Sequence, residues 1–304
     1  ANFFPIGQAP VSQFNILDGL LSAPLIWIFG LRVGFNLACV CILASTAWGM
    51  WFLARCLGLK SFPAVVAGLG LECSGFVLHE ISSGRPTQAF LVFFLLALAG
   101  VAQIAQGKGG RWTPLWTGLC AALLTLTYWY NAVFFGVFAL VLWVTFRSNW
   151  SRPVWLRIGL AATVALVLIF PFLVQLSADF SELPGVAREA NTVDGLTPLV
   201  GSEYGLRAAI QDSEWPLWPL IPMPNSDKLN LSWILLVLGG LGLWRGGKTA
   251  RPFAVVFGVG WVMALGPFLF MSNVTPTGIH LPYKWVYEGV PFMDRLWWPH
   301  RWQV

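Results

Sequence analysis

Long apolar runs without charge are the feature that most constrains the fold of this 304-residue chain. Residues 33–54 and 87–105 contain no Asp, Glu, Lys or Arg, and each has about the twenty residues that a helix needs to cross a bilayer. Strands of a β-barrel would instead alternate polar and apolar residues over about ten positions. Because a helix satisfies its own backbone in lipid, we predict an all-α, polytopic transmembrane helical bundle. A mean hydropathy of +0.70 and 10% charged residues exclude an ordinary soluble domain.

The apolar runs predict about eight spans. They are residues 33–54, 61–78, 87–105, 112–130, 131–146, 158–176, 231–244 and 252–271. We expect residues 15–30, which are moderately apolar and contain Pro24, to form an interfacial helix. The predicted domains are a juxtamembrane segment at 1–32, a six-span bundle at 33–176, a large extracytoplasmic loop at 177–230, two further spans within 231–271, and an aromatic, charged segment at 272–304.

The charged residues separate onto alternate loops. The short turns contain only cations, which are Arg55, Lys60, Lys108, Arg111, Arg147, Arg152, Arg157, Arg245, Lys248 and Arg251. The other loops contain every acidic residue except Glu72, and all three histidines. The positive-inside rule places the cationic turns in the cytoplasm. We therefore predict an integral protein of the bacterial inner (plasma) membrane, with the long loop and both ends of the chain extracytoplasmic and with Ala1 and Val304 inside a longer protein.

Several classes of function are disfavoured by the composition. The net charge of +5 comes from cations dispersed among short loops, so it does not indicate nucleic-acid binding. The five cysteines lie in or beside apolar spans without metal-ligand spacing, and we interpret them as small apolar residues. No phosphate-binding glycine loop, zinc motif or nucleophile elbow is present, which disfavours ATP-driven and soluble-hydrolase chemistry.

The outer loops collect the candidate chemistry. Arginine binds phosphate oxygens through two parallel hydrogen bonds, and a carboxylate can accept a hydroxyl proton or hold a divalent cation. Such a cation is the one cofactor that the sequence suggests. Carboxylates and cations at a membrane surface therefore suit a reaction on a lipid-linked phosphate. The alternative for each of these residues is a charge that only solvates its loop.

Two groups of residues are the sharpest candidates. The first is His79 and Glu80 with Arg85, in a tight turn between two spans; interface capping is the alternative. The second, in the aromatic C-terminal segment, comprises Asp294, Arg295, His300 and Arg301; an aromatic belt at the interface is the alternative. Glu72 precedes His79 by seven residues, which would put both on one helical face, and it has either a functional or a structural role.

The order of these features resembles a known family. The matching residues are Phe3-Phe4-Pro5, Asp18-Gly19, Pro24-Leu25, Gly34-Phe35-Asn36-Leu37, Leu53-Ala54-Arg55, Ala67-Gly68, Ser83-Gly84-Arg85, Pro282-Tyr283, Val290-Pro291-Phe292, Arg295, Pro299 and Arg301. In this order the chain resembles bacterial C-type (GT-C) membrane glycosyltransferases. The resemblance covers most of the chain and consists of loose motifs.

The resemblance implies an activity and a set of site residues. It implies transfer of a sugar from a polyprenyl-phosphate donor to an acceptor on the extracytoplasmic face. A catalytic Asp is expected in the first outer loop, largely before Ala1, where Asp18 is the acid left. Glu80 and Asp294 are the other candidate catalytic carboxylates. His79, Arg85, Arg295, His300 and Arg301 are the candidate substrate-binding residues. Related proteins often have Gly-His where this chain has Gly84-Arg85, which favours phosphate binding there.

Two other functions remain open on the sequence. A transporter or lipid-handling protein would have charges facing one another in mid-membrane, and only Glu72 lies inside a span. A non-catalytic subunit of a larger membrane complex would use the 18 Trp and 23 Phe for contacts with lipid and with other membrane subunits. The expected partners are the bilayer, a polyprenyl-phosphate sugar and an acceptor, without nucleic acid.

Overall fold

The computed structural model describes residues 16–82, 84–146, 150–182, 233–264, 268–272 and 275–289. Most of the predicted outer loop, at 183–230, lies outside the described residues, as do Asp294, Arg295, His300 and Arg301. Asp18 and His79 lie in described helices, but their side chains are not described. The chain divides into two compact units, Ala1–Phe180 and Ser181–Val304, each of which is described by itself.

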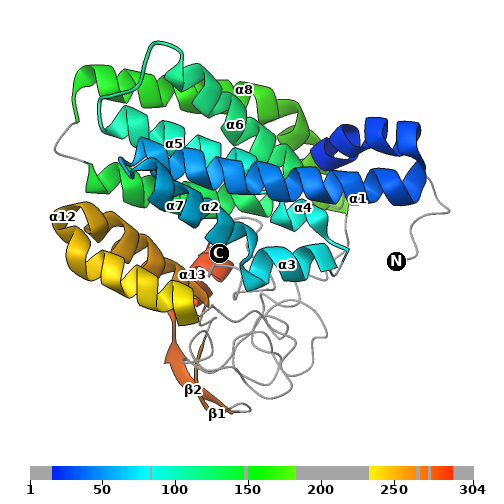
Figure 1. Ribbon diagram of the computed structural model, residues 1–304. Coiled ribbons are helices and arrows are strands. Elements are labelled where there is room, and N and C mark those ends of the chain that lie inside the picture. Colours follow the sequence, from blue (N-terminus) through cyan, green and yellow to red (C-terminus); the bar gives the residue numbers. More distant parts are fainter. Residues whose placement is uncertain are drawn as a thin grey trace. The chain divides into compact units, whose positions relative to one another are not determined.

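The first unit is a bundle of helices (Figure 1), as the sequence predicts. Its helices are α1 (Ile16–Cys56), α2 (Ser61–Glu72), α3 (Gly75–Ser82), α4 (Pro86–Ala89), α5 (Val92–Ala105), α6 (Thr113–Thr127), α7 (Tyr130–Thr145) and α8 (Arg152–Glu182). Helix α8 continues six residues into the segment predicted to be loop.

The predicted number of eight spans is not confirmed. Among the described residues, three apolar helical stretches are long enough to cross a membrane: Gly19–Cys56, Pro86–Ala105 and Arg152–Gln175. A fourth exists if α2 and α3, which are bent by 41°, count as one span. Helices α6 and α7 are apolar but have only 15 and 16 residues.

Helix α1 breaks at Gly30, between the residue ranges 15–30 and 33–54 that are predicted as separate segments. Gly30 has φ 77°, a conformation that favours glycine. The segment before it folds back along the segment after it (Figure 1). A Cβ placed on Gly34 would lie 2.5 Å from the Cα of Ile26, so the two segments approach closely because Gly34 has no side chain.

Small residues also set the contacts between helices. A Cβ on Gly68 of α2 would lie 2.6 Å from the carbonyl oxygen of Ala47 in α1. A Cβ on Gly100 of α5 would collide with Thr117 of α6, and one on Gly118 of α6 with the backbone of Ala161 in α8. Helices in lipid gain little from burying apolar side chains, and they usually pack through close backbone contact at small residues.

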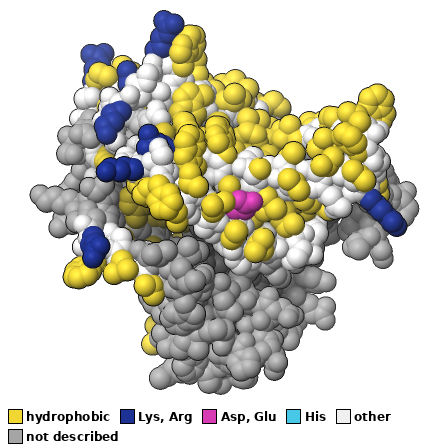
Figure 2. Space-filling view, viewed as in Figure 1, with side chains coloured by type: hydrophobic (Ala, Val, Ile, Leu, Met, Phe, Trp, Pro, Cys, Tyr) yellow, Lys and Arg dark blue, Asp and Glu magenta, His cyan; other side chains and the backbone are white. Residues whose placement is uncertain are grey.

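The outer surface of the first unit is rich in large apolar side chains. Leu31 and Trp27 of α1 and Phe62 of α2 are 70%, 88% and 79% exposed, and hydrophobic side chains cover much of the face in Figure 2. Soluble proteins rarely expose apolar patches of this extent. Together with the long apolar helices, this surface is compatible with a membrane protein.

The two ends of the bundle differ in charge. Gln103 Nε2 donates to Cys56 Sγ (2.9 Å), and Arg157 Nη1 donates to the Gly109 carbonyl (2.7 Å). These bonds bring the α1–α2, α5–α6 and α7–α8 connections to one end, which we call the basic end. Its described cations are Arg55, Lys60, Lys108, Arg111, Arg152 and Arg157, without an acidic residue among the described positions of these connections. Figure 2 shows Lys and Arg side chains gathered there.

The described part of the second unit contains α12 (Trp233–Ala264), β1 (Phe268–Ser272), β2 (Thr275–His280) and α13 (Pro282–Gly289). Helix α12 covers most of the two ranges predicted as the last spans, 231–244 and 252–271, and the basic residues between them. The prediction of a span through residue 271 is wrong, and the unit is not all-α, because β1 pairs with β2 as an antiparallel hairpin. Pro267 disfavours continuation of the helix, and Phe268, Phe270 and Thr275 are residue types that favour strands.

We expect Gly68→Ala to destabilise the first unit by about 1–3 kcal/mol, because its methyl group would meet the backbone oxygen of Ala47. The matched control is Gly136→Ala in α7, whose new methyl group would meet nothing within 4 Å; it should be neutral or slightly stabilising. Thermal unfolding of both variants in detergent micelles measures the difference. Equal stability of the two variants would contradict the packing described for α1 and α2.

Candidate functional site

The α3–α4 turn lies at the end of the bundle opposite the basic end, where the sequence predicts a site. The N–H of Arg85 donates to the carbonyl of Glu80 (2.8 Å), and the N–H of Gly84 donates to that of Ile81 (3.1 Å). Gly84 has φ 72°. These two bonds and the left-handed glycine form a Schellman motif, which ends α3 and reverses the chain into Pro86 of α4.

Glu80 and Arg85 form an ion pair within this motif. Arg85 Nε lies 2.8 Å from Glu80 Oε2, in the geometry of an ion pair rather than of an aligned hydrogen bond. The side chains are 40% exposed for Arg85 and 2% for Glu80. These two positions of a Schellman motif often make a hydrophobic contact; in this turn the pair neutralises a buried carboxylate that would otherwise be costly.

A break between α2 and α3 positions Glu80. Ser74 Oγ accepts a hydrogen bond from the N–H of Val77 (3.3 Å), as an N-cap of α3. Helix α2 ends at Glu72, and the two helices are bent by 41°. Glu72 and His79 therefore lie on different helices, because the Ser74 cap starts a new helix between them, and the prediction that they share a face, which assumed one helix, is not tested.

A second break, between α4 and α5, is stabilised by Thr46 of α1. The Thr46 hydroxyl donates to the carbonyl of Ala89 (2.9 Å) and accepts from the N–H of Leu91 (3.3 Å). Thr46 is fully buried. The N–H of Leu91 also donates to the Ala89 carbonyl (2.9 Å), so the Thr46 hydroxyl adds a second hydrogen bond to each of two backbone groups at the break.

Other polar groups lie towards this end of the bundle. Gln88 Oε1 in α4 and Asn131 Nδ2 at the start of α7 are buried without a hydrogen-bond partner in the structure. Trp129 and Tyr130, at the α6–α7 turn, stack with ring centroids 3.8 Å apart. Buried amide atoms of this kind usually bind water or a ligand, so this end has unmet hydrogen-bonding capacity.

The structure brings together some of the predicted site residues. Glu80 and Arg85 are paired, and His79 precedes Glu80 on α3. Asp18 lies in the first segment of α1. The remaining candidates, Asp294, Arg295, His300 and Arg301, are outside the described residues. Within the described ranges, no group of three or more His, Cys, Asp or Glu residues could hold a metal ion.

Three polar residues near this end are not predicted from the sequence: Thr46, Gln88 and Asn131. Each lies inside or at the edge of a predicted apolar span, and that placement is the signal that could have indicated them, because a polar side chain at membrane depth needs a partner. The distances between their groups depend on the helix breaks, which the apolar pattern does not locate.

No protein-family model, curated protein or solved structure matches this chain. The resemblance to GT-C glycosyltransferases therefore stays a prediction.

We expect Arg85→Met to destabilise the first unit by about 1–3 kcal/mol, because it leaves the buried Glu80 carboxylate without its cation. The double variant Glu80→Gln with Arg85→Met should recover part of that loss, since it removes both charges. Thermal unfolding of Arg85→Met, Glu80→Gln and the double variant forms a double-mutant cycle, which isolates the interaction between the two side chains. Strictly additive effects would show that the pair contributes nothing to stability.

Proposed function

We propose that this chain belongs to a membrane glycosyltransferase that moves a sugar from a polyprenyl-phosphate donor to an acceptor on the extracytoplasmic face of a bacterial inner membrane. The observation that carries the proposal is the position of Arg85. It is half-exposed and held by the buried Glu80, at the end of the bundle opposite the basic end. A fixed guanidinium at that position suits the phosphate of a membrane lipid.

The distance along the bundle supports this placement. The apolar stretch Pro86–Ala105 has 20 residues, which corresponds to about 30 Å of helix. That length matches the hydrocarbon thickness of a bilayer. With the α5–α6 cations at one surface, Arg85 lies at the level of the opposite headgroups, where the phosphate of a polyprenyl phosphate resides.

Arg85 and Glu80 take different roles in this proposal. The guanidinium has five N–H donors in a planar fork; Nε faces Glu80, and the terminal nitrogens suit two phosphate oxygens. Glu80 is buried against Arg85, so it acts as a positioning residue. The general base is then Asp18 or Asp294.

The reaction is a displacement at the anomeric carbon. The acceptor hydroxyl attacks that carbon while the bond from it to the phosphate oxygen breaks, and the polyprenyl phosphate leaves with the bonding electrons. A carboxylate accepts the hydroxyl proton. Arg85 stabilises the negative charge that develops on the leaving phosphate, which is the kind of electrostatic stabilisation on which such transfers depend.

We expect Arg85→Gln to weaken binding of undecaprenyl monophosphate by about tenfold or more, since hydrogen bonds to a charged group contribute ~1.5–3 kcal/mol. Arg85→Lys should be intermediate, because an ammonium lacks the planar fork. The control is Arg111→Gln at the basic end. Binding to the purified full chain in nanodiscs measures the effect, and an unchanged affinity of Arg85→Gln would refute the phosphate site.

A turnover assay separates catalysis from binding. Wild-type chain is incubated with a panel of labelled polyprenyl-phosphate hexoses, and release of polyprenyl phosphate is followed for Asp18→Asn, Glu80→Gln and Asp294→Asn. Loss of release in Asp18→Asn or Asp294→Asn with unchanged donor binding identifies the base. Release that persists in all three variants would show that the site residues are wrong, and lipid-phosphate binding without any release would favour a non-catalytic subunit.

A further inference from the structure

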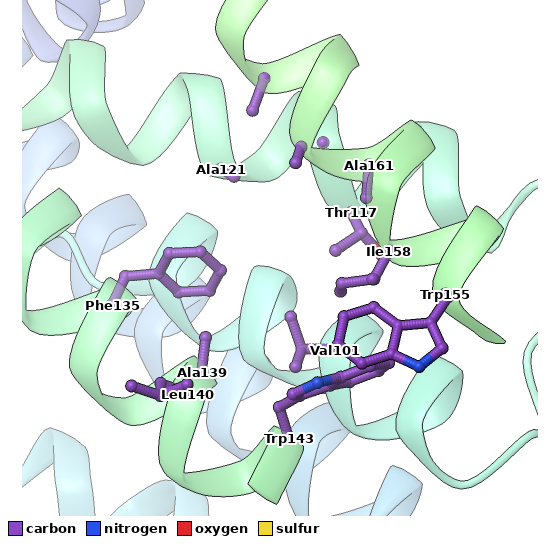
Figure 3. Close-up of a pocket in the computed structure, with 13 residues that line it drawn as sticks. Val101, Thr117, Ala121, Phe135, Ala139, Leu140, Trp143, Trp155, Ile158 and Ala161 are labelled. Carbon is purple, nitrogen blue, oxygen red and sulfur yellow. The ribbon is translucent and has the colours of Figure 1, made fainter. Parts of the chain in front are cut away.

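An apolar groove lies in the half of the first unit nearest the basic end. It has a volume of about 300 Å³ and is lined by residues of α5, α6, α7 and α8. Figure 3 shows side chains from these helices directed into it. Its lining includes Val101, Ala121, Phe135, Ala139, Trp143 and Ala161. It is separate from the Glu80–Arg85 pair, which lies at the opposite end.

The lining of the groove suits hydrocarbon and not water. The one hydroxyl in it, that of Thr117, already donates to the Thr113 carbonyl (2.6 Å). The space is created by small residues on facing helices, including Ala121, Ala139 and Ala161 (Figure 3). Apolar cavities stay dry and accept hydrocarbon. The volume corresponds to about ten water-sized groups, which is enough for a segment of one acyl chain.

The groove opens towards the outer surface of the bundle. Two of its lining residues, Leu140 of α7 and Trp155 of α8, are 61% and 51% exposed. Helix α8 around it is apolar and largely exposed, as Leu156 and Leu160 show. In a membrane, the neighbours of such a surface are lipid chains, so a chain can enter from the side without crossing a polar region.

Cations and indole rings lie at the end of the groove nearest the membrane surface. Arg152 precedes Trp155 by three residues, so the two side chains are neighbours on the surface of α8, and Trp155 lines the groove. Trp143, Trp150 and Trp155 pack together, with ring centroids 5.1 to 5.4 Å apart. Arg157 of α8 donates a hydrogen bond to Gly109 in the α5–α6 turn, which also contains Lys108. Trp and Arg are the residues that anchor a protein at headgroup level.

We propose that this groove binds one acyl chain of an anionic phospholipid from the leaflet at the basic end, with its phosphate beside Arg152. Two observations favour this occupant: the lining is almost entirely apolar, and the described residues around the adjoining end are cationic without an acid. A zwitterionic lipid would fill the groove but gain less from the cations. This site does not depend on the proposed sugar transfer.

Native mass spectrometry of the purified full chain tests the proposal, with palmitoyl-oleoyl phosphatidylglycerol and the matching phosphatidylcholine as probes. Ala139→Phe fills the groove and should reduce retention of phosphatidylglycerol at least tenfold. Its control is Leu166→Phe, at a position of α8 that is 57% exposed and does not line the groove. Arg152→Gln should weaken retention about fivefold, and its control is Arg32→Gln, outside the basic end.

Each outcome decides a separate part of the proposal. The proposal is supported if phosphatidylglycerol is retained preferentially and if Ala139→Phe and Arg152→Gln both reduce that retention. Both control variants should retain it as the wild type does. Full retention by Ala139→Phe would exclude the groove as the site. Equal retention of both lipids with no effect of Arg152→Gln would overturn the headgroup assignment. Because Arg152 is exposed, Arg152→Gln should remain folded even if Ala139→Phe disturbs the packing of the bundle.

Discussion

The need to satisfy backbone hydrogen bonds in apolar surroundings determines the architecture of the first unit. An unpaired N–H or C=O in apolar surroundings costs several kcal/mol, so a break of a helix inside the bundle is stabilised by a local hydrogen-bond partner. Ser74 caps α3, Thr46 bonds to both sides of the α4–α5 break, and left-handed glycines at 58, 84 and 107 close the ends of three helices. At these positions, the breaks and ends of the helices are stabilised by specific side chains and glycines.

Glycine has two separate functions in this bundle. At positions such as Gly84 it adopts a backbone conformation that other residues reach only at a cost. At positions such as Gly68 and Gly118 it is helical, and its value is the absence of a side chain where two backbones meet. The first function sets where helices end, and the second sets how closely they pack. The composition does not distinguish them, since both appear simply as Gly.

Much of the fold could be predicted from the sequence, and the remainder has identifiable physical causes. Apolar length predicted the helices of the first unit, Pro24 and the weaker apolarity before residue 31 predicted a separate segment, and the arrangement of cations predicted one basic end. The break after Glu72 and the strand at 268–272 were missed, because hydropathy does not register a serine cap or the pairing of two short strands. The Glu80–Arg85 pair was predicted as a group, but the burial of Glu80 depends on packing that no local pattern encodes.

The Schellman turn at Gly84 connects ligand binding to local folding. Glu80 and Arg85 take the two positions that commonly hold such a turn closed by a hydrophobic contact, and a hydrophobic contact has no competitor in water. An ionic contact has one, since an anion that binds Nε of Arg85 would take the place of Glu80. An anion that draws Arg85 away leaves a desolvated carboxylate behind and weakens the closure of α3. Binding of an anion that displaced Glu80 would therefore be thermodynamically linked to loosening of the turn, whereas a phosphate bound only by the terminal nitrogens of Arg85 would leave the turn closed.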